Sequence, residues 1–318
     1  MTNQNSPRPQ WLVIVNPNAG NGKGKREWKL ISKALTDNNI SFEEKFTTGK
    51  ADAVNITFSA IEEGFRKIIT VGGDGTLNEV LNGVFKTGAC NSSEITLALI
   101  PVGTGNDWGR MFDIPLDHEK AARIIMEGKT MLHDVGLLSY SEGQMVKNRY
   151  FINIAGLGFE SVVVRRSNYQ KERGRSGKLI YFYNLLLSLM TYRNTRAELI
   201  IDGVRISEDI FSVNVGNGKY CGGGMRQTPD ALPNDGLLDV TVIKNIGKLE
   251  IIRKLKILYD GTILSHPLID GYKCRNLKVN SENIIYTEAD GESLGHTPAE
   301  FNILPAAINI VYGTRSIQ

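Results

Sequence analysis

The sequence predicts an α/β N-terminal domain built on a parallel sheet, followed by a mostly antiparallel β-sandwich domain. Two observations carry this prediction. Through the first 130 residues, short apolar runs alternate with helix-like stretches, which is the pattern of parallel βα units. From residue 131 onward, strand-like runs follow one another directly, with Gly and Asn-Asp turn signals between them, which is typical of antiparallel sheets.

The chain has 318 residues and a mass of 35.2 kDa, which corresponds to about two domains of ordinary size. Lys and Arg (37) exceed Asp and Glu (34) by a net charge of only +3, which is too little to indicate a nucleic-acid partner. The three cysteines include no CxxC pair, and the four histidines form no HxH or HxxxH pair. The composition therefore argues against a disulfide framework and against zinc or histidine-rich metal centres.

The first ten residues are polar and contain two prolines, so we expect residues 1–10 to be a disordered leader. The first apolar run, residues 11–15, is far too short for the hydrophobic core of a signal peptide. No stretch approaches the ~20 apolar residues that a membrane-spanning helix needs. The sequence therefore predicts a cytoplasmic protein.

Residues 11–130 are expected to form the α/β domain. The buried run WLVIV opens it, and helical spacing appears between the later runs: Leu77, Val80, Leu81 and Val84 would share one helix face. The expected strands cover residues 11–15, 41–48, 67–71 and 96–103, and the expected helices run from the first glycine-rich loop to about residue 38, over 51–64 and over 76–85.

Residues 131–304 are expected to form the β-sandwich domain. Its expected strands cover residues 132–140, 149–159, 197–204, 209–218, 236–243, 276–281 and 283–292, and two helices interrupt them at 176–193 and 248–261. A last strand, residues 307–313, follows Pro305. We expect the segment 305–318 to return to the sheet of the first domain.

Three loops rich in Gly, Asn, Asp and Thr follow the first, third and fourth expected strands. They are NPNAG (16–20), GGDGT (72–76) and PVGTGND (101–107). In an open parallel sheet ligands bind outside the carboxyl ends of the strands, so these loops describe one crevice. Glycines let backbone N–H groups approach an anion, and a helix N-terminus favours phosphate. The Walker A spelling GxxxxGK[ST] is absent, and the first loop lacks GxGxxG.

Three acids are candidates for chemistry. Asp74 lies inside GGDGT, where its charge suits contact with Mg²⁺, a phosphate-bound water or an acceptor hydroxyl better than simple phosphate binding. Asp290 and Glu292 lie on either side of Gly291, so a turn there would aim both at one site. A hydrophilic hairpin turn is the alternative interpretation of this pair.

These segments resemble a known family. VGGDGTLNEVLNG (71–83) and PVGTGNDWGRMF (101–112) look like the bacterial soluble lipid kinases, relatives of the diacylglycerol kinase and sphingosine kinase catalytic domains. NPNAG, GLGFE (156–160), PDALPNDGLLDV (229–240) and EADGE (288–292) follow in the order of that family. The resemblance covers nearly the whole chain beyond the first ten residues, and it implies a diacylglycerol kinase- or NAD kinase-like N-terminal domain that binds nucleotide.

The resemblance implies a role for each matching residue. Glu292 corresponds to the proton acceptor, Asp290 to its partner acid, and Asp74 to a further catalytic acid. Asp235 corresponds to a ligand of a structural Mg²⁺, helped by backbone carbonyls at about Leu232 and Leu237. Either Thr47 or Thr48 matches a threonine that contacts the nucleotide. The positions implied for ATP are Asn16, Pro17, Asn18, Ala19, Gly20, Thr48, Gly72, Gly73, Asp74, Gly75, Thr76, Leu77, Asn78, Thr104, Asn106 and Asp107.

The function that the resemblance implies is an ATP- and Mg²⁺-dependent kinase of a lipid hydroxyl, with diacylglycerol giving phosphatidic acid as the leading reaction. An NAD kinase-like enzyme of a small molecule stays open, because NAD kinases share GGDGT. A non-catalytic regulator that binds nucleotide or lipid is the third alternative.

A basic stretch and an apolar run bear on how a lipid would be reached. Residues 165–178 hold six Lys or Arg and a single Glu, and residues 179–190 contain only two polar side chains. The run is too short to span a bilayer, and it suits an interfacial or a buried helix. We expect the basic stretch to approach the inner face of the membrane, where the lipid substrate lies. A homodimer stays open.

Overall fold

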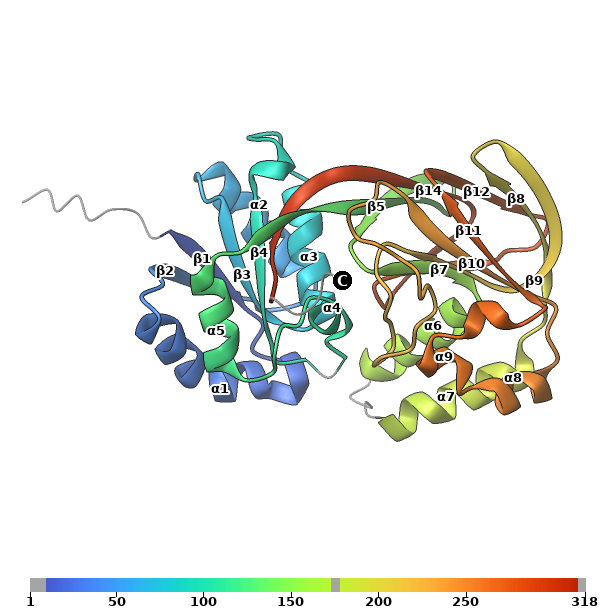
Figure 1. Ribbon diagram of the computed structural model, residues 1–318, viewed down its shortest axis with the longest axis horizontal. Coiled ribbons are helices and arrows are strands. Elements are labelled where there is room, and N and C mark those ends of the chain that lie inside the picture. The colour runs from blue at the N-terminus through green and yellow to red at the C-terminus, as the bar shows by residue number, and fades with distance from the viewer. Residues whose placement is uncertain (1–9, 104, 173–177, 314–318) are drawn as a thin grey trace, which may run out of the picture. The chain divides into compact units, whose positions relative to one another are not determined.

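The computed structural model describes residues 10–103, 105–172 and 178–313, which form two compact units (Figure 1). The first unit comprises residues up to Leu132 together with Ala307 onward, and the second comprises His133–Ala306. The chain passes from one unit to the other twice, within the long strands β5 (Thr130–Glu142) and β14 (Glu292–Val311). The expected leader at residues 1–9 lies outside the described residues.

The strands of the first unit pair in the order β14, β4, β3, β1, β2. Each of these four pairings is parallel, and Asn309 of β14 pairs with Thr96 at the start of β4. The bounds are β1 (Trp11–Val15), β2 (Phe42–Phe46), β3 (Lys67–Gly72) and β4 (Thr96–Pro101). The β1 strand is buried along its whole length, as a strand covered on both faces should be.

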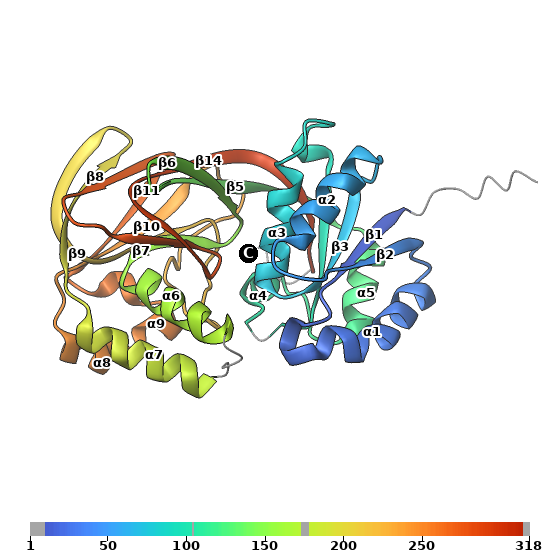
Figure 2. The same ribbon diagram turned by 180° about the vertical axis from the view of Figure 1, so that it is seen from behind.

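Helices cover both faces of this sheet. The pair α1 and α5 packs together, as does the pair α2 and α3, and Figure 2 shows the second pair in front of the strands. The predicted face of Leu77, Val80, Leu81 and Val84 is confirmed, because all four side chains are buried. The bounds are α1 (Ala19–Asp37), α2 (Asp52–Glu62), α3 (Asp74–Val84), α4 (Asp107–Met111) and α5 (His118–Glu127), with a short 3-10 turn η1 (Ser92–Glu94).

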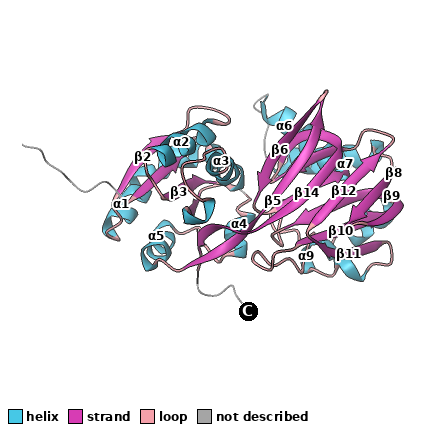
Figure 3. Cartoon of the chain, turned by 90° about the horizontal axis from the view of Figure 1, so that it is seen from above, coloured by secondary structure: helices cyan, strands magenta, loops and turns pink. Residues whose placement is uncertain are grey.

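The strands of the second unit pair antiparallel and close a ring. Starting from β9, the ring runs through β7, β13, β14, β12 and β8 and returns to β9. The strands β10 and β11 extend from β9, and β6 pairs with β5 (Figure 3). The bounds are β6 (Met145–Phe151), β7 (Ile154–Gly158), β8 (Thr195–Ile201), β9 (Val204–Gly216), β10 (Leu238–Lys244), β11 (Ile269–Cys274), β12 (Asn276–Ser281) and β13 (Tyr286–Ala289). Apolar side chains from around the ring, among them Leu199, Val213, Leu277 and Phe301, form one buried cluster.

Four helices lie together on one side of these strands in Figures 1 and 2. They are α6 (Phe159–Glu172), α7 (Lys178–Thr191), α8 (Lys248–Lys254) and α9 (Ile257–Asp260), followed by the 3-10 turn η2 (Ile263–Ser265). Within the described ranges, no helix is both long enough and apolar enough to cross a membrane.

Several elements differ from the expected ones. The run 149–159 is two strands, β6 and β7, and the helix α6 follows at once although its start, FESVVV, is rich in β-branched residues. The expected helix 248–261 is split into α8 and α9. The helix α5 was not expected, although Asp117 caps its first turn and Gly128, with φ +69°, ends it.

The last strand is much longer than the expected 307–313, because β14 begins at Glu292. Its residues 292–296 pair with β13, 299–302 with β12 and 309–310 with β4, and β14 also pairs with β5.

Candidate active site

The three glycine-rich loops meet at the carboxyl edge of the first unit's sheet. The N–H of Asn16 donates to the Val71 carbonyl over 2.9 Å, which ties the loop after β1 to the end of β3. The N–H of Val102 donates to the Gly72 carbonyl over 2.8 Å, which ties the loop after β4 to the same point. The side-chain amide of Asn16 also donates to the Thr76 hydroxyl over 2.9 Å. The loops predicted to lie together at this edge are therefore joined by direct hydrogen bonds.

The backbones of these loops lie so close together that two positions must be glycine. A Cβ on Gly103 would lie 2.7 Å from the Cα of Gly73, so neither loop has room for a side chain at this contact. Gly20 has φ +59°, and a Cβ there would lie 2.0 Å from the Val102 carbonyl oxygen. The loops approach as closely as they do only because these positions are glycine.

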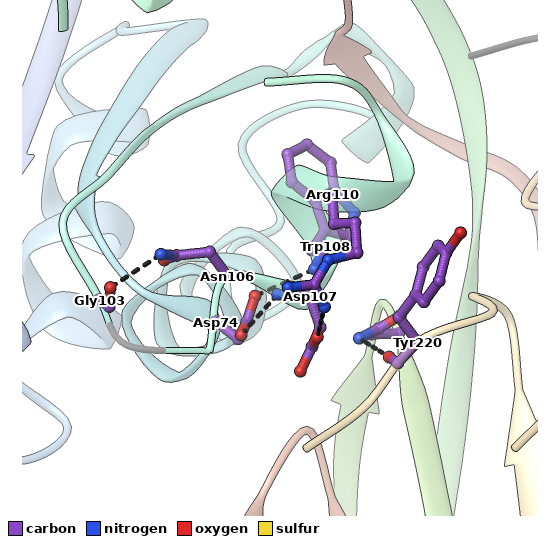
Figure 4. A network of polar contacts seen from close by, with 8 residues as sticks. Asp74, Gly103, Asn106, Asp107, Trp108, Arg110 and Tyr220 are labelled. Atoms are coloured by element: carbon purple, nitrogen blue, oxygen red, sulfur yellow. Dashed lines mark hydrogen bonds and ion pairs between the residues drawn. The ribbon is translucent and has the colours of Figure 1, made fainter. Parts of the chain in front are cut away.

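Asp74, the first residue of α3, holds two of the loops together (Figure 4). Its Oδ2 accepts a hydrogen bond from the N–H of Asp107 over 3.0 Å, and its Oδ1 accepts one from the N–H of Trp108 over 3.1 Å. Burial raises the pKa of Asp74, while these two N–H groups and the charge of Arg110 act in the opposite direction. The carboxylate is thus directed at the backbone of α4.

The residues around Asp74 form a compact polar network, drawn in Figure 4. Asn106 has φ +51°, and its side-chain amide donates to the Gly103 carbonyl over 2.7 Å. The buried carboxylate of Asp107 accepts a hydrogen bond from the Arg110 guanidinium over 2.6 Å. Trp108 packs beneath the loop, with its ring centroid 4.7 Å from that of Phe112.

The remaining residues implied for ATP lie in or next to these loops, with two exceptions. Pro17, Asn18 and Ala19 follow β1, and the N–H of Asn18 donates to Asn16 Oδ1 over 3.0 Å. Gly75, Leu77 and Asn78 lie in the first turns of α3, where Leu77 and Asn78 are buried. The hydroxyl of Thr48, after β2, donates to Asp52 Oδ2 over 2.9 Å. The neighbouring Thr47 is buried. Thr104 lies outside the described residues.

The EADGE segment forms a hairpin turn that carries Asp290 and Glu292. Asp290 and Gly291 form a two-residue turn with φ +47° and +79° between β13 and β14. The carboxylate of Asp290 accepts hydrogen bonds from three consecutive backbone N–H groups, at residues 152, 153 and 154, over 3.0 to 3.1 Å. Glu292 is the first residue of β14 and is partly exposed. The Asp290 carboxylate is therefore directed at the backbone of residues 152–154.

Two further acids of the second unit, Glu160 and Glu288, were not singled out from the sequence. Glu160 is the second residue of α6, and its Oε1 accepts a hydrogen bond from the side-chain amide of Gln227. Burial raises the pKa of Glu160 to about 8. Burial, and then the charge of Glu160, raises the pKa of the buried Glu288 well above its usual value. The GLGFE and EADGE segments gave the signal that would have identified both.

Asp235, which the resemblance assigns to a Mg²⁺ site, contacts two other groups of the chain. Its Oδ1 accepts a hydrogen bond from the N–H of Leu237 over 3.1 Å, and its Oδ2 lies 3.0 Å from the ammonium of Lys273. The same ammonium is 3.2 Å from Asp239 Oδ2. Within the described parts of the chain, no cluster of three or more His, Cys, Asp or Glu side chains is arranged to hold a metal.

The basic stretch 165–178 is described only in part. Arg165 lies on the α6 helix, and its guanidinium stands 4.0 Å from the centroid of the Tyr286 ring. Residues 173–177 lie outside the described residues, as do the side chains of Lys171 and Lys178.

Comparisons with known proteins agree on one family. Residues 10–138 match the diacylglycerol kinase catalytic domain, and residues 153–312 match the YegS C-terminal NAD kinase beta sandwich-like domain. The chain is 31% identical to a diacylglycerol kinase of Bacillus subtilis, over 94% of this chain and 95% of that protein. It is 28% identical to a diacylglycerol kinase of Mycobacterium tuberculosis, over 94% of each.

Solved structures show the same fold. A diacylglycerol kinase from Bacillus anthracis matches 97% of this chain and 98% of its own, with a TM-score of 0.72 and 24% identity. Yeast NADH kinase in complex with NADH matches 97% of this chain and 85% of its own, with a TM-score of 0.53 and 13% identity. At these identities the two likenesses concern the fold alone.

The resemblance predicted from the sequence motifs, and with it the C-terminal β-sandwich, is confirmed by these matches. The two matched domains together span nearly all of the described residues. The chain belongs to the bacterial lipid kinases that join a diacylglycerol kinase catalytic domain to a YegS C-terminal domain, and it is a phosphotransferase with an alcohol group as acceptor.

Proposed function

We propose that this protein transfers the γ-phosphate of Mg·ATP to the hydroxyl of diacylglycerol and so produces phosphatidic acid. The observation that carries the proposal is the joining of three glycine-rich loops at the carboxyl edge of a parallel sheet. Such an edge binds phosphate through backbone N–H groups. The relatives named diacylglycerol kinase, which match along almost the whole chain, support the acceptor.

The nucleotide is held by the first unit in this proposal. The loops after β1, β3 and β4 offer N–H groups that glycine leaves accessible, and α3 begins at the second loop with its N-terminus toward the same edge. Thr48 is the threonine we assign to the nucleotide, since its neighbour Thr47 is buried. Mg²⁺ enters bound to ATP, as part of the substrate.

Asp74 is a positioning residue in this account. Its two oxygens are committed to the N–H groups of Asp107 and Trp108, so it fixes one phosphate-binding loop against the other. A loop displaced by about 1 Å can cost on the order of 10²-fold in rate, so this contact matters although it is remote from the transferred group.

Glu292 is the proton acceptor that we propose. As the bond forms between the acceptor oxygen and the γ-phosphorus, the hydroxyl proton passes to the Glu292 carboxylate, and the bond to the β-phosphate oxygen breaks to release ADP. Asp290 holds the hairpin that presents Glu292, because its carboxylate binds three backbone N–H groups of the 152–154 segment. It is therefore a positioning residue too.

A substrate in the bilayer implies peripheral contact with the inner face of the membrane. The cations of the 165–178 stretch suit anionic headgroups, each contributing about 1 kcal/mol near the surface. One of them, Arg165, is stacked on Tyr286, which leaves the rest of the stretch as the candidate contact.

The test is labelled phosphate transfer from Mg·ATP to a panel of acceptors in mixed micelles: diacylglycerol, a sphingoid base and phosphatidylglycerol, with NAD offered separately. We expect labelled phosphatidic acid as the main product. Label on NAD alone would support the small-molecule kinase that the fold also allows. ATP binding with no labelled product from any acceptor would support a non-catalytic regulator.

A further inference from the structure

The hairpin that presents Glu292 is held by more contacts than those of the Asp290 carboxylate. Asp290 and Gly291 form its two-residue turn, and Glu292 follows directly as the first residue of β14. A Cβ on Gly291 would meet nothing within 4 Å among the described residues, so the turn is open on that side. The orientation of its peptide groups, and with it the direction of the Glu292 side chain, therefore depends on hydrogen bonds.

Glu288 holds the first of these peptide groups. Its Oε2 accepts a hydrogen bond over 3.0 Å from the N–H of Gly291, which belongs to the peptide group between Asp290 and Gly291. The Glu288 side chain is buried, and burial, followed by the charge of Glu160, raises its pKa well above the usual value. A neutral carboxyl still has an oxygen that accepts this bond. The turn therefore requires an acceptor from Glu288 rather than a charge.

Asn168 holds the second peptide group. Its side-chain amide donates to the Gly291 carbonyl over 3.3 Å. This carbonyl belongs to the planar peptide group between Gly291 and Glu292. The orientation of that plane sets where the Cα–Cβ bond of Glu292 points, so the Asn168 contact acts directly on the residue that carries the carboxylate.

The α6 helix, from which Asn168 reaches the turn, contacts the same hairpin at a second point. Arg165 lies three residues before Asn168 and so on the same face of the helix. Its guanidinium stands 4.0 Å from the centroid of the Tyr286 ring, on β13. One face of α6 therefore contacts both a strand of the hairpin and its turn.

We propose that Asn168 and Glu288 are positioning residues for phosphate transfer: they hold the two peptide groups on either side of Gly291 and so fix the direction in which the Glu292 carboxylate leaves the hairpin. The inference rests on the proposed reaction with Glu292 as the proton acceptor, and it adds the residues that orient this acceptor.

The first experiment removes the Asn168 contact. Asn168→Ala is compared with Gln170→Ala, the matched control, because residue 170 lies about 200° further round α6. Transfer to diacylglycerol in mixed micelles is measured over ranges of ATP and lipid concentration. A positioned base contributes about 10²-fold or more, so we expect a misdirected Glu292 to lower kcat about tenfold, with KM for ATP and for lipid within about twofold of wild type.

Gln170→Ala should keep the wild-type kcat. A wild-type kcat in Asn168→Ala, or an equal loss in Gln170→Ala, would overturn the role of Asn168.

The second experiment distinguishes an acceptor from a charge at Glu288. Glu288→Gln keeps a side-chain oxygen for the Gly291 N–H, whereas Glu288→Leu, of similar size, removes it. We expect kcat within about threefold of wild type in the Gln variant and about tenfold lower in the Leu variant. Thermal melting checks that both fold, and Glu288→Met replaces Glu288→Leu if the latter does not. Equal kcat values in the folded variants would overturn the role of Glu288.

A double-variant cycle tests whether Asn168 acts through Glu292. If Asn168 only orients Glu292, its removal should cost little once the carboxylate is gone. Asn168→Ala should therefore lower the residual kcat of Glu292→Gln by less than about twofold, against about tenfold in the wild-type background. A tenfold loss in both backgrounds would overturn the proposed route.

Hydrogen exchange separates this proposal from the kinase function. The full chain is prepared with isotope-labelled glycine, and exchange of the Gly291 N–H is followed by NMR without nucleotide. We expect protection in wild type and in Glu288→Gln, and exchange about tenfold or more faster in Glu288→Leu. This result would support the positioning contact even if wild type phosphorylates no lipid. Equally fast exchange in all three proteins would overturn it even if diacylglycerol is phosphorylated.

Discussion

The two candidate binding regions of this molecule are lined by different chemical groups. At the sheet edge of the first unit, the contacts are made by backbone N–H and carbonyl groups and by short side chains, and glycine is required at Gly20 and Gly103. In the second unit, a pocket bounded by α6, α7, α8 and α9 is lined almost entirely by large apolar side chains. Oriented backbone dipoles suit a phosphate group, whereas an apolar surface suits an alkyl chain.

The largest effect is expected from adding one methyl group at the sheet edge of the first unit. In Gly103→Ala, the new Cβ would lie 2.7 Å from the Gly73 Cα, so the loops must move apart. We expect the affinity for ATP and the rate of phosphate transfer to fall, the rate by about 10²-fold. Calorimetric titration with a non-hydrolysable ATP analogue and the transfer assay measure the two effects.

Gly88→Ala is the matched control, since a Cβ on this exposed glycine would meet nothing within 4 Å. It should bind the analogue as wild type does. Normal binding by Gly103→Ala would show that the loop contact is not part of the nucleotide site.

The second prediction compares two acids whose carboxylates bind backbone N–H groups, Asp74 in the first unit and Asp290 in the second. Asp290→Asn weakens three backbone hydrogen bonds and Asp74→Asn weakens two, and in each a side-chain N–H replaces one acceptor oxygen. Hydrogen bonds to charged groups contribute about 1.5–3 kcal/mol, so we expect a loss of about 2–3 kcal/mol in the free energy of unfolding for Asp290→Asn. The loss for Asp74→Asn should be smaller.

Urea unfolding of both variants measures these losses, and the transfer assay shows whether turnover falls with them. Wild-type stability and wild-type turnover in either variant would remove that acid from the positioning role.

The third prediction concerns pH. The pKa of Glu160 is about 8 in the folded protein, above its usual value of 4.5, so between these values the unfolded chain binds fewer protons than the folded one. The contribution of Glu160 to stability is therefore lost as the pH rises from about 5 to 8, at a rate of on the order of 1 kcal/mol per pH unit at most. The stability of Glu160→Gln should depend less steeply on pH.

The other titratable groups near Glu160 are Glu288 on β13 and Tyr192 at the end of α7, and both remain in the variant. Glu282→Gln, at an exposed position, is the control and should follow the wild-type curve. Identical pH profiles for wild type and Glu160→Gln would show that Glu160 titrates normally.

The smallest expected effect is at Asp235. Because Lys273 occupies the cation position beside this carboxylate, addition of Mg²⁺ should leave the melting temperature of wild type unchanged. Lys273→Gln should lose about 0–1 kcal/mol, as partly exposed ion pairs do. A stabilisation of wild type by millimolar Mg²⁺ that Asp235→Asn abolishes would restore the implied metal site.

The difference between backbone groups and apolar side chains also explains which of the two regions could be predicted from the sequence. Gly, Asn and Asp at fixed spacing after buried strands indicate a sheet edge at which backbone groups make the contacts. The loops at 16–20, 72–76 and 101–107 were therefore found from the sequence. The pocket was not found, because its walls come from strands and helices far apart in the chain. The run from residue 149 appeared to be one strand, and α6, with three consecutive valines, resembles a strand locally.

The roles of individual acids were also beyond sequence reasoning. The spacing of Asp290 and Glu292 placed both in one turn, but the direction of each side chain depends on the partner that it finds. Asp290 binds the backbone of residues 152–154, where β6 ends and β7 begins, more than a hundred residues earlier in the chain. Lys273 likewise reaches Asp235 from another strand, which no local pattern predicts.

The most direct test of the account is phosphate transfer from Mg·ATP to diacylglycerol by wild type and by Glu292→Gln, with ATP affinity measured on the same preparations. The account predicts phosphatidic acid from wild type, a loss of turnover of about 10²-fold or more in the variant, and ATP affinity within about twofold of wild type. Turnover retained by Glu292→Gln would contradict the assignment of Glu292 as the proton acceptor, and no phosphatidic acid from wild type would contradict the proposed reaction itself.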